Sequence, residues 1–242
     1  MCTVTFMARK RGYYLGMNRD ESLTRPAALP PQVRREKGCA VVSPSEPGGG
    51  TWISVNDRGV TFALINWYAI EAQPNGKAVS RGIVVRDVAS VEFREDAEGV
   101  IQALPLDGLN PFRLIGFFPL AEEIREWRWD QKSLTHQRHP WRTQQWISSG
   151  FDEPAAQRVR QGTFLAAQLQ RSAGTLGWLR RLHQSHRPEK GPCSHCMHRT
   201  DAQTVSYTEI VVSPRRSIMR YQAGPPCQDG SATEYILSPR PN

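Results

Sequence analysis

The chain has 242 residues, 39% of them hydrophobic and 9% aromatic, which is enough to bury the core of a single globular domain over residues 1–242. This composition excludes a disordered protein, and no apolar run approaches the ~20 residues of a membrane-spanning helix. The net charge of +8 comes from basic residues that are spread thinly and accompany no binding motif, so we expect no nucleic acid partner.

Cysteine usage and the first apolar run indicate the compartment. The chain carries five cysteines, an odd number that argues against a disulfide framework. Arg9, Lys10 and Arg11 interrupt the first apolar run, which therefore lacks the hydrophobic region of a secretory signal. The sequence predicts reduced thiols and a cytoplasmic location.

The opening stretch contains two apolar runs that are expected to pair as a hairpin. Cys2–Ala8 is the first run, Arg9–Gly12 is a basic turn, and Tyr13–Gly16 is the second run. The polar tetrad Asn18-Arg19-Asp20-Glu21 follows. If the runs pair, the tetrad returns beside the start of the chain and brings an amide, a guanidinium and two carboxylates close to the thiol of Cys2.

The next part of the chain predicts a loop and a second hairpin. Ser22–Gly50 contains five prolines and a glycine triplet, so we expect a loop with one short strand around Cys39–Ser43. Thr51–Val55 and Val60–Trp67 flank an Asn-Asp-Arg-Gly turn, a strong hairpin signal. The second of these runs is almost continuously apolar, so both of its faces should be covered. It ends near Asn66, an amide that needs hydrogen-bond partners there.

Helices and strands then follow in blocks. Ser80 and Ser90 are expected to cap the first two helices, and Asp152 or Glu153 begins a third. The expected helices are Arg81–Ala89, Glu92–Leu104, a segment from 153 to about Arg171, and Gly174–His186. The expected strands are Phe112–Phe118, Ile124–Asp130, Ser133–Arg138, Gln145–Ser149, Thr204–Val212, Ser217–Tyr221 and Ala232–Leu237. Because hairpins dominate and no βαβ alternation appears, we predict an α+β protein with stacked sheets and helices outside them.

Cys2 is a candidate nucleophile. Removal of Met1 would leave a thiol and a free α-amine on one residue, and the amine, with a pKa near ~7.7–8.0, would act as base for the thiol. A carboxylate of the tetrad would orient the ammonium group, and an arginine would favour the thiolate. The alternatives are an ordinary early residue behind a retained Met1, and a tetrad that forms a solvated turn.

These residues also carry a resemblance to a known family. Met1-Cys2-Thr3, the tetrad followed by Arg25-Pro26, Gly49–Ile53 and Leu64-Ile65-Asn66 together resemble the NRDE family, which includes the eukaryotic transport and Golgi organisation protein 2. The resemblance is strongest over the N-terminal third of the chain. Proteins of this family have been linked to haem handling, so the resemblance also implies reversible haem binding as an open alternative.

The NRDE family in turn resembles the N-terminal nucleophile hydrolases, especially the group with penicillin V acylase and bile salt hydrolase. That resemblance implies a four-layer αββα sandwich of two antiparallel sheets. It also implies that Cys2 is nucleophile and base, that Arg19 and Asp20 support it, and that Asn66 is an oxyanion donor.

The chain departs from the acylase pattern in three places. The arginine of the tetrad is shifted by one position, which on a strand means the opposite face, so Asn18 is expected to point inward and Arg19 outward. The mid-chain asparagine of the acylases is replaced, with Ser149 as its substitute. A late arginine of the acylases corresponds to Arg199.

A second group of reactive side chains lies in the segment Cys193–Arg199, which reads Cys-Ser-His-Cys-Met-His-Arg. Its C-x2-C pair and two histidines suit zinc, with Cys227 or Cys39 as a further ligand. The alternatives are a polar wall of the N-terminal site ahead of Thr204, and simple loop filling. Met197 breaks the Cys-x-x-Cys-His motif of covalent haem attachment. We assign no metal and no cofactor from the sequence.

Two functions follow from these observations. The first is a cysteine hydrolase that acts on a linear amide other than a peptide bond. The second is a carrier or chaperone for haem or another hydrophobic metabolite, because fold alone does not decide function. An inactive relic of the hydrolase site is a third possibility. The sequence specifies neither the substrate nor the oligomeric state.

Overall fold

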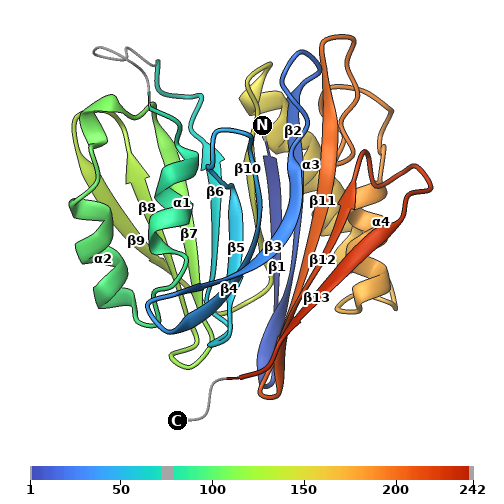
Figure 1. Ribbon diagram of the computed structural model, residues 1–242. Coiled ribbons are helices and arrows are strands. Elements are labelled where there is room, and N and C mark those ends of the chain that lie inside the picture. Colours follow the sequence, from blue (N-terminus) through green and yellow to red (C-terminus); the bar gives the residue numbers. More distant parts are fainter. Residues whose placement is uncertain (1, 72–78, 240–242) are drawn as a thin grey trace.

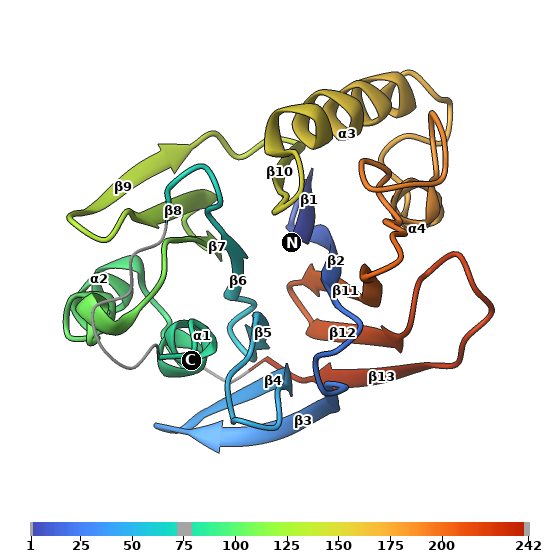
Figure 2. The same ribbon diagram turned by 90° about the horizontal axis from the view of Figure 1, so that it is seen from above.

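Two antiparallel sheets face each other, and helices cover the outer face of each (Figures 1 and 2). The computed structural model describes residues 2–71 and 79–239. Within these residues, the first sheet has the strand order β10-β1-β2-β11-β12-β13 and the second has the order β3-β4-β5-β6-β7-β8-β9. Helices α1 and α2 pack on the second sheet and α3 and α4 on the first. The predicted four-layer α+β sandwich is therefore confirmed.

The first sheet contains β1 (Cys2–Arg9), β2 (Gly12–Ser22), β10 (Gln144–Ser148), β11 (Ala202–Ser213), β12 (Arg216–Ala223) and β13 (Ala232–Leu237). The second contains β3 (Leu29–Glu36), β4 (Cys39–Ser45), β5 (Ile53–Asn56), β6 (Thr61–Asn66), β7 (Phe112–Phe118), β8 (Glu123–Trp129) and β9 (Leu134–His139). The helices are α1 (Gly82–Val88), α2 (Arg94–Gln102), α3 (Glu153–Gln168) and α4 (Leu176–Gln184). Leu106–Gly108 forms a short 3₁₀ turn. Of the helices described, none is long and apolar enough to cross a membrane.

The main core lies between the two sheets and is rich in aromatic rings. Phe6 of β1 stacks on Phe117 of β7 at 5.1 Å between ring centroids, and Trp141 meets Phe6 edge-on at 4.7 Å. Tyr13 belongs to the same cluster, and its hydroxyl donates to either Gly59 O or Thr61 Oγ1, each 2.7 Å away. Such rings bury a large apolar area while the hydroxyl keeps a polar partner, so this layer holds the sheets face to face.

The strand β2 is longer than the sequence predicted. It runs to Ser22, so the tetrad lies inside a strand and Asn18, Arg19 and Asp20 are buried. The alternative of a solvated turn is wrong. Because β1 and β11 pair with β2 on its two sides, the backbone of the polar residues is hydrogen-bonded and the strand continues through them.

The segment after the tetrad holds two strands where one was expected. Only β4 was anticipated, near Cys39–Ser43, whereas β3 was missed. Pro30 and Pro31 suggested a loop, but β3 is the outermost strand of its sheet, and its register shifts between Leu29 and Gln32. Proline is tolerated on an edge strand because one side of that strand has no ladder to donate to.

Helix caps were predicted with mixed success. Asp152 caps α3 as expected, because its Oδ1 accepts from Ala155 N at 2.8 Å. Helix α2 begins after Phe93 and has no side-chain cap, so the expected cap at Ser90 is wrong. The N-cap of α1 is Arg81, which makes no side-chain cap bond, so the expected cap at Ser80 is also wrong. Ser80 Oγ instead accepts from Gly82 N at 3.2 Å, from one residue further upstream.

Candidate active site at the start of the first strand

Cys2 and the end of the tetrad meet because of the hairpin register. Arg9 pairs with Gly12 across a two-residue turn, and counting back from that pair places Arg19 opposite Cys2 and Asn18 opposite Thr3. Residues directly opposite in an antiparallel pair share a face. Arg19 therefore lies with Cys2 on the face toward the second sheet, and the expectation that Asn18 points inward and Arg19 outward is wrong.

A cavity of about 330 Å³ lies between the two sheets where β1 begins and β2 and β6 end. Four of the predicted site residues line it: Cys2, Arg19, Asp20 and Asn66. Its volume falls within the range of small-molecule sites. The other lining side chains include several charged groups, namely Glu21, Arg25, Glu46 and Arg81, together with Thr51, Trp52, Ser80 and Asn110.

The thiol of Cys2 is buried, with 7% of the residue exposed. Burial raises the pKa of the Cys2 thiol, the Asp20 carboxylate raises it further, and the Arg19 guanidinium opposes both. Arg19 therefore lowers the pKa of the thiol, as expected, but the net shift of that pKa is upward. A thiol in this state needs a base before it can attack a carbonyl. Met1 lies outside the described residues.

Arg19 is held by a network at the mouth of the cavity. Its guanidinium lies 4.4 Å above the Trp52 ring, and its NH2 group is 2.7 Å from Glu46 and 3.2 Å from Glu21. Arg25 bridges the same two carboxylates, at 2.8 Å from Glu21 and 3.2 Å from Glu46. The cavity therefore offers a substrate both positive and negative groups.

Asp20 forms a buried ion pair that the sequence analysis missed. Its Oδ2 lies 3.1 Å from Arg160 NH2 of α3, and both side chains are fully buried. Thr204 Oγ1 donates to Asp20 Oδ1 at 2.6 Å, and Arg160 NH1 donates to Thr3 Oγ1 at 2.6 Å. These contacts hold the carboxylate in one position beside the start of β1.

A sequence signal for Arg160 was present. Ala156, Arg160, Phe164 and Ala167 are buried on one face of α3, and they follow the spacing of a core-facing helical stripe. An arginine on such a stripe needs a buried anionic partner. The pattern predicts that a partner exists, but it does not say which carboxylate provides it.

Asn66 is the last residue of β6 and is half-buried. Its Nδ2 donates to the Tyr68 hydroxyl at 2.6 Å. Arg81, at the start of α1, lines the same cavity and donates to Pro111 O at 3.1 Å. Burial lowers the pKa of the Arg81 guanidinium. Asn66 and Arg81 thus line the cavity from β6 and the start of α1.

The remaining predicted residues do not line the cavity. Asn18 lies on the helix-facing side, where its Nδ2 donates to His183 O at 2.9 Å and His195 O at 2.8 Å. Ser149 is buried just after β10, whose Ser148 pairs with Cys2. Arg199 pairs with Asp201 at 2.7 Å and its guanidinium lies over the Phe151 ring.

The cysteine- and histidine-rich segment is divided by the structure. Cys196 and His198 gather with His186 and Cys227, two residues outside the segment. His195 is instead buried, with Gln145 Nε2 at 2.9 Å from its Nε2. Cys39, the other proposed ligand, lies elsewhere and its thiol contacts Asp57 at 3.0 Å.

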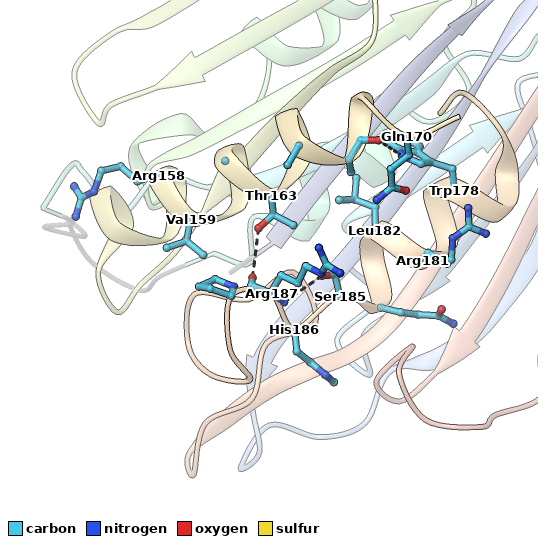
Figure 3. A pocket seen from close by; sticks show the side chains of 15 residues that line it. Arg158, Val159, Thr163, Gln170, Trp178, Arg181, Leu182, Ser185, His186 and Arg187 are labelled. Carbon is cyan, nitrogen blue, oxygen red and sulfur yellow. Dashed lines mark hydrogen bonds between the residues drawn. The ribbon is translucent and has the colours of Figure 1, made fainter. Parts of the chain in front are cut away.

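A larger cavity of about 930 Å³ lies in the outer layer, between α3 and α4 (Figure 3). Thr163 and Arg158 of α3 line one side, and Trp178 and Leu182 of α4 line the other. His186 lies at its end, with its side chain directed away from Thr163 (Figure 3). The cavity contains none of the residues expected to react, so its size does not make it the candidate site.

A family model described as Transport and Golgi organisation 2 matches residues 1–119. The predicted family resemblance is confirmed. The matched residues include the tetrad and every residue named above as lining the cavity with Cys2. No curated protein matches the chain significantly.

Two solved structures share the fold. One is the C2A mutant of conjugated bile acid hydrolase from Clostridium perfringens, with a TM-score of 0.58 and 9% identity over 100% of this chain and 97% of that one. The other is penicillin V acylase from Agrobacterium tumefaciens, with a TM-score of 0.54 and 9% identity over 98% of this chain and 86% of that one. At these identities the similarity shows the fold alone, and that fold is the predicted one of the N-terminal nucleophile hydrolases.

Proposed function

We propose that this protein is a cysteine N-terminal nucleophile hydrolase that cleaves a linear amide other than a peptide bond. The observation that carries the proposal is the convergence of Cys2, Arg19, Asp20 and Asn66 on one cavity at the ends of three strands. The two neighbours of the fold are named as a hydrolase and an acylase, which supports the same reaction class.

The chemistry requires Cys2 to be the first residue of the mature protein. Its α-amine would take the thiol proton, and the thiolate would attack the amide carbon to give a tetrahedral oxyanion. The resulting ammonium group would return the proton to the leaving amine as the C–N bond breaks. Water, activated by the same amine, would then hydrolyse the thioester and release the acid.

The surrounding side chains suit these steps. The Asp20 carboxylate, fixed by Arg160 and Thr204, would hold the α-ammonium group. Asn66 Nδ2 would turn from the Tyr68 hydroxyl toward the oxyanion, a contribution typically worth ~10²–10³ in rate. Arg19, set by Trp52 and Glu46, would orient the substrate.

The lining of the cavity favours a polar substrate. Three carboxylates and three guanidinium groups line the cavity around the thiol, and apolar cargo would have to desolvate them without compensation. An amide with charged or hydrogen-bonding substituents satisfies them. This argues for the hydrolase over a carrier of haem or another hydrophobic metabolite.

The decisive experiment compares two forms of one chain. The first carries an uncleaved N-terminal tag, and the second is cut directly before Cys2, with intact mass verifying both. We expect hydrolysis of a panel of N-acyl amides, and a trapped thioester adduct, only from the cut form. Cys2→Ala abolishes both, whereas Cys193→Ser, a thiol outside the cavity, leaves them unchanged.

Two results would overturn the proposal. One is retention of Met1 in the protein purified from its own cells. The other is a cut form that hydrolyses nothing yet binds haem equally with and without the Cys2→Ala change, which would favour the carrier.

A further inference from the structure

Four side chains converge outside the candidate active site, three from the connection between α4 and β11 and one from the turn between β12 and β13. His186 follows α4, Cys196 and His198 lie in the loop before β11, and Cys227 lies in the turn between β12 and β13. One nitrogen or sulfur atom from each lies within 4.8 Å of all the others. Cys196 is buried, and the other three are partly exposed.

The separations match a tetrahedral metal site. With Zn–S bonds of ~2.3 Å and Zn–N bonds of ~2.0–2.1 Å, tetrahedral geometry places sulfur and nitrogen ligands roughly 3.5 Å apart. His198 Nε2 lies 3.5 Å from Cys196 Sγ and 3.4 Å from Cys227 Sγ. No two of the four ligand atoms are more than 4.8 Å apart, so a small rotation of one side chain would bring the most distant pair to the tetrahedral spacing.

Hydrogen bonding within this group includes a bond between the Cys196 and Cys227 thiols but is incomplete. A neutral imidazole nitrogen accepts a single hydrogen bond, yet two thiol sulfurs lie within reach of His198 Nε2. His186 Nε2 is buried and has no hydrogen-bond partner among the described residues. A buried polar atom without a partner is costly, and a metal ion would satisfy all four atoms at once.

We propose that His186, Cys196, His198 and Cys227 form a structural zinc site. Binding forms two Zn–S and two Zn–N bonds and releases the two thiol protons to solvent, so the thiolates balance the charge of the ion. The protein fills all four positions, which leaves none for water or substrate, as in structural rather than catalytic zinc sites. Cys193 is not a ligand, although it completes the C-x2-C pattern.

The site would also fix the backbone behind the candidate active site. The loop that carries Cys196 and His198 also presents one carbonyl oxygen to α3 and one to the first sheet. Arg160 Nε donates to Cys193 O at 3.4 Å, and Asn18 Nδ2 donates to His195 O at 2.8 Å. Zinc would therefore tie the end of α4 and the β12–β13 turn to the loop that supports the Asp20–Arg160 pair.

The test measures metal on the full chain, purified under reducing conditions. We expect about one zinc per chain in the wild type and in Cys193→Ser, and a loss of at least about tenfold in affinity in Cys196→Ser and Cys227→Ser. Co²⁺ added to the metal-free wild type should give intense visible bands of tetrahedral geometry and a thiolate charge-transfer band. A chelator should lower the melting temperature of the wild type and of Cys193→Ser, but not that of Cys227→Ser.

Several results would overturn the site. Loss of zinc from Cys193→Ser as complete as that from Cys196→Ser would assign the metal to the C-x2-C pair. The wild type alone refutes the proposal if it binds neither zinc nor Co²⁺, whatever the variants do. A Cys196–Cys227 disulfide in protein purified without reductant, with no metal after reduction, would do the same. None of these measurements depends on amide hydrolysis.

Discussion

The buried ion pair between Asp20 and Arg160 gives the sharpest test of how the site is held. Both side chains are fully buried, and their nearest atoms are 3.1 Å apart. Arg160→Met keeps an unbranched apolar stem but removes the guanidinium from Asp20, Thr3 and the carbonyl of Cys193. The carboxylate then stays buried without the Arg160 guanidinium.

Removing one partner of a buried pair costs about 3–5 kcal/mol, because the other charge loses its compensation. For a chain of this size each kcal/mol lowers the melting temperature by about 2–4 °C. We therefore expect Arg160→Met to melt roughly 6–20 °C below the wild type. The matched control is Arg158→Met, an exposed arginine on the same helix, which should change stability by less than about 0.5 kcal/mol.

Urea unfolding compares the stabilities of Arg160→Met and Arg158→Met. A double-mutant cycle of Arg160→Met with Asp20→Asn measures the coupling energy between Asp20 and Arg160. Asparagine keeps an oxygen to accept from Thr204, so the cycle isolates the charge. We expect a coupling of about 0.5–3 kcal/mol. A variant Arg160→Met as stable as Arg158→Met, or an additive cycle, refutes the reasoning.

Three further predictions use other parts of the structure. Gly16→Ala would place a Cβ 2.9 Å from His183 Nε2 and should lower the free energy of unfolding by about 1–3 kcal/mol. Gly162→Ala, on the open face of α3, should raise it by about 0.5–1 kcal/mol. Urea titrations that reverse this order would contradict the packing. Burial lowers the pKa of His183 to about 3, so below pH ~6.5 the unfolded chain binds more protons and stability falls with falling pH, by up to about 1.4 kcal/mol per unit. The free energy of unfolding, measured between about pH 7 and pH 5, should lack this His183-dependent fall in His183→Gln. The exposed control His136→Gln should still show the fall. Asn66→Ala should lower kcat for any amide that the cut form hydrolyses by about 10²–10³, and an unchanged kcat would remove Asn66 from the oxyanion role.

Local patterns predicted most of the architecture. The run Val60–Trp67 was expected to be covered on both faces, and β6 is buried over Thr61–Ile65. Hairpins form between neighbouring segments, so alternation and turn residues suffice to find them. Prediction failed at β3, where Pro30 and Pro31 indicate a loop, because an edge position is a property of the whole sheet.

The orientation of the tetrad was within reach of the sequence. The two-residue turn between Arg9 and Gly12 sets which residues of β1 and β2 lie opposite each other. Each step back along β1 from Arg9 is a step forward along β2 from Gly12, so Cys2 lies opposite Arg19. Comparison with the acylases by position within the motif gave the opposite face. Register decides the face of a strand residue, because side chains alternate with a period of two.

The sequence by itself determined the strand-rich α+β class, the family resemblance and the proximity of the tetrad to Cys2, since each depends on neighbouring residues. Tertiary structure alone decided that Arg160 is the partner of Asp20, and that His186 and Cys227 join Cys196 and His198. The contacts of Arg160 with Asp20 and of Cys227 with the two histidines and Cys196 join segments that are far apart in the chain. Periodicity shows that a buried charge or a soft ligand needs a partner, but only the packing of sheets and loops selects which residue provides it.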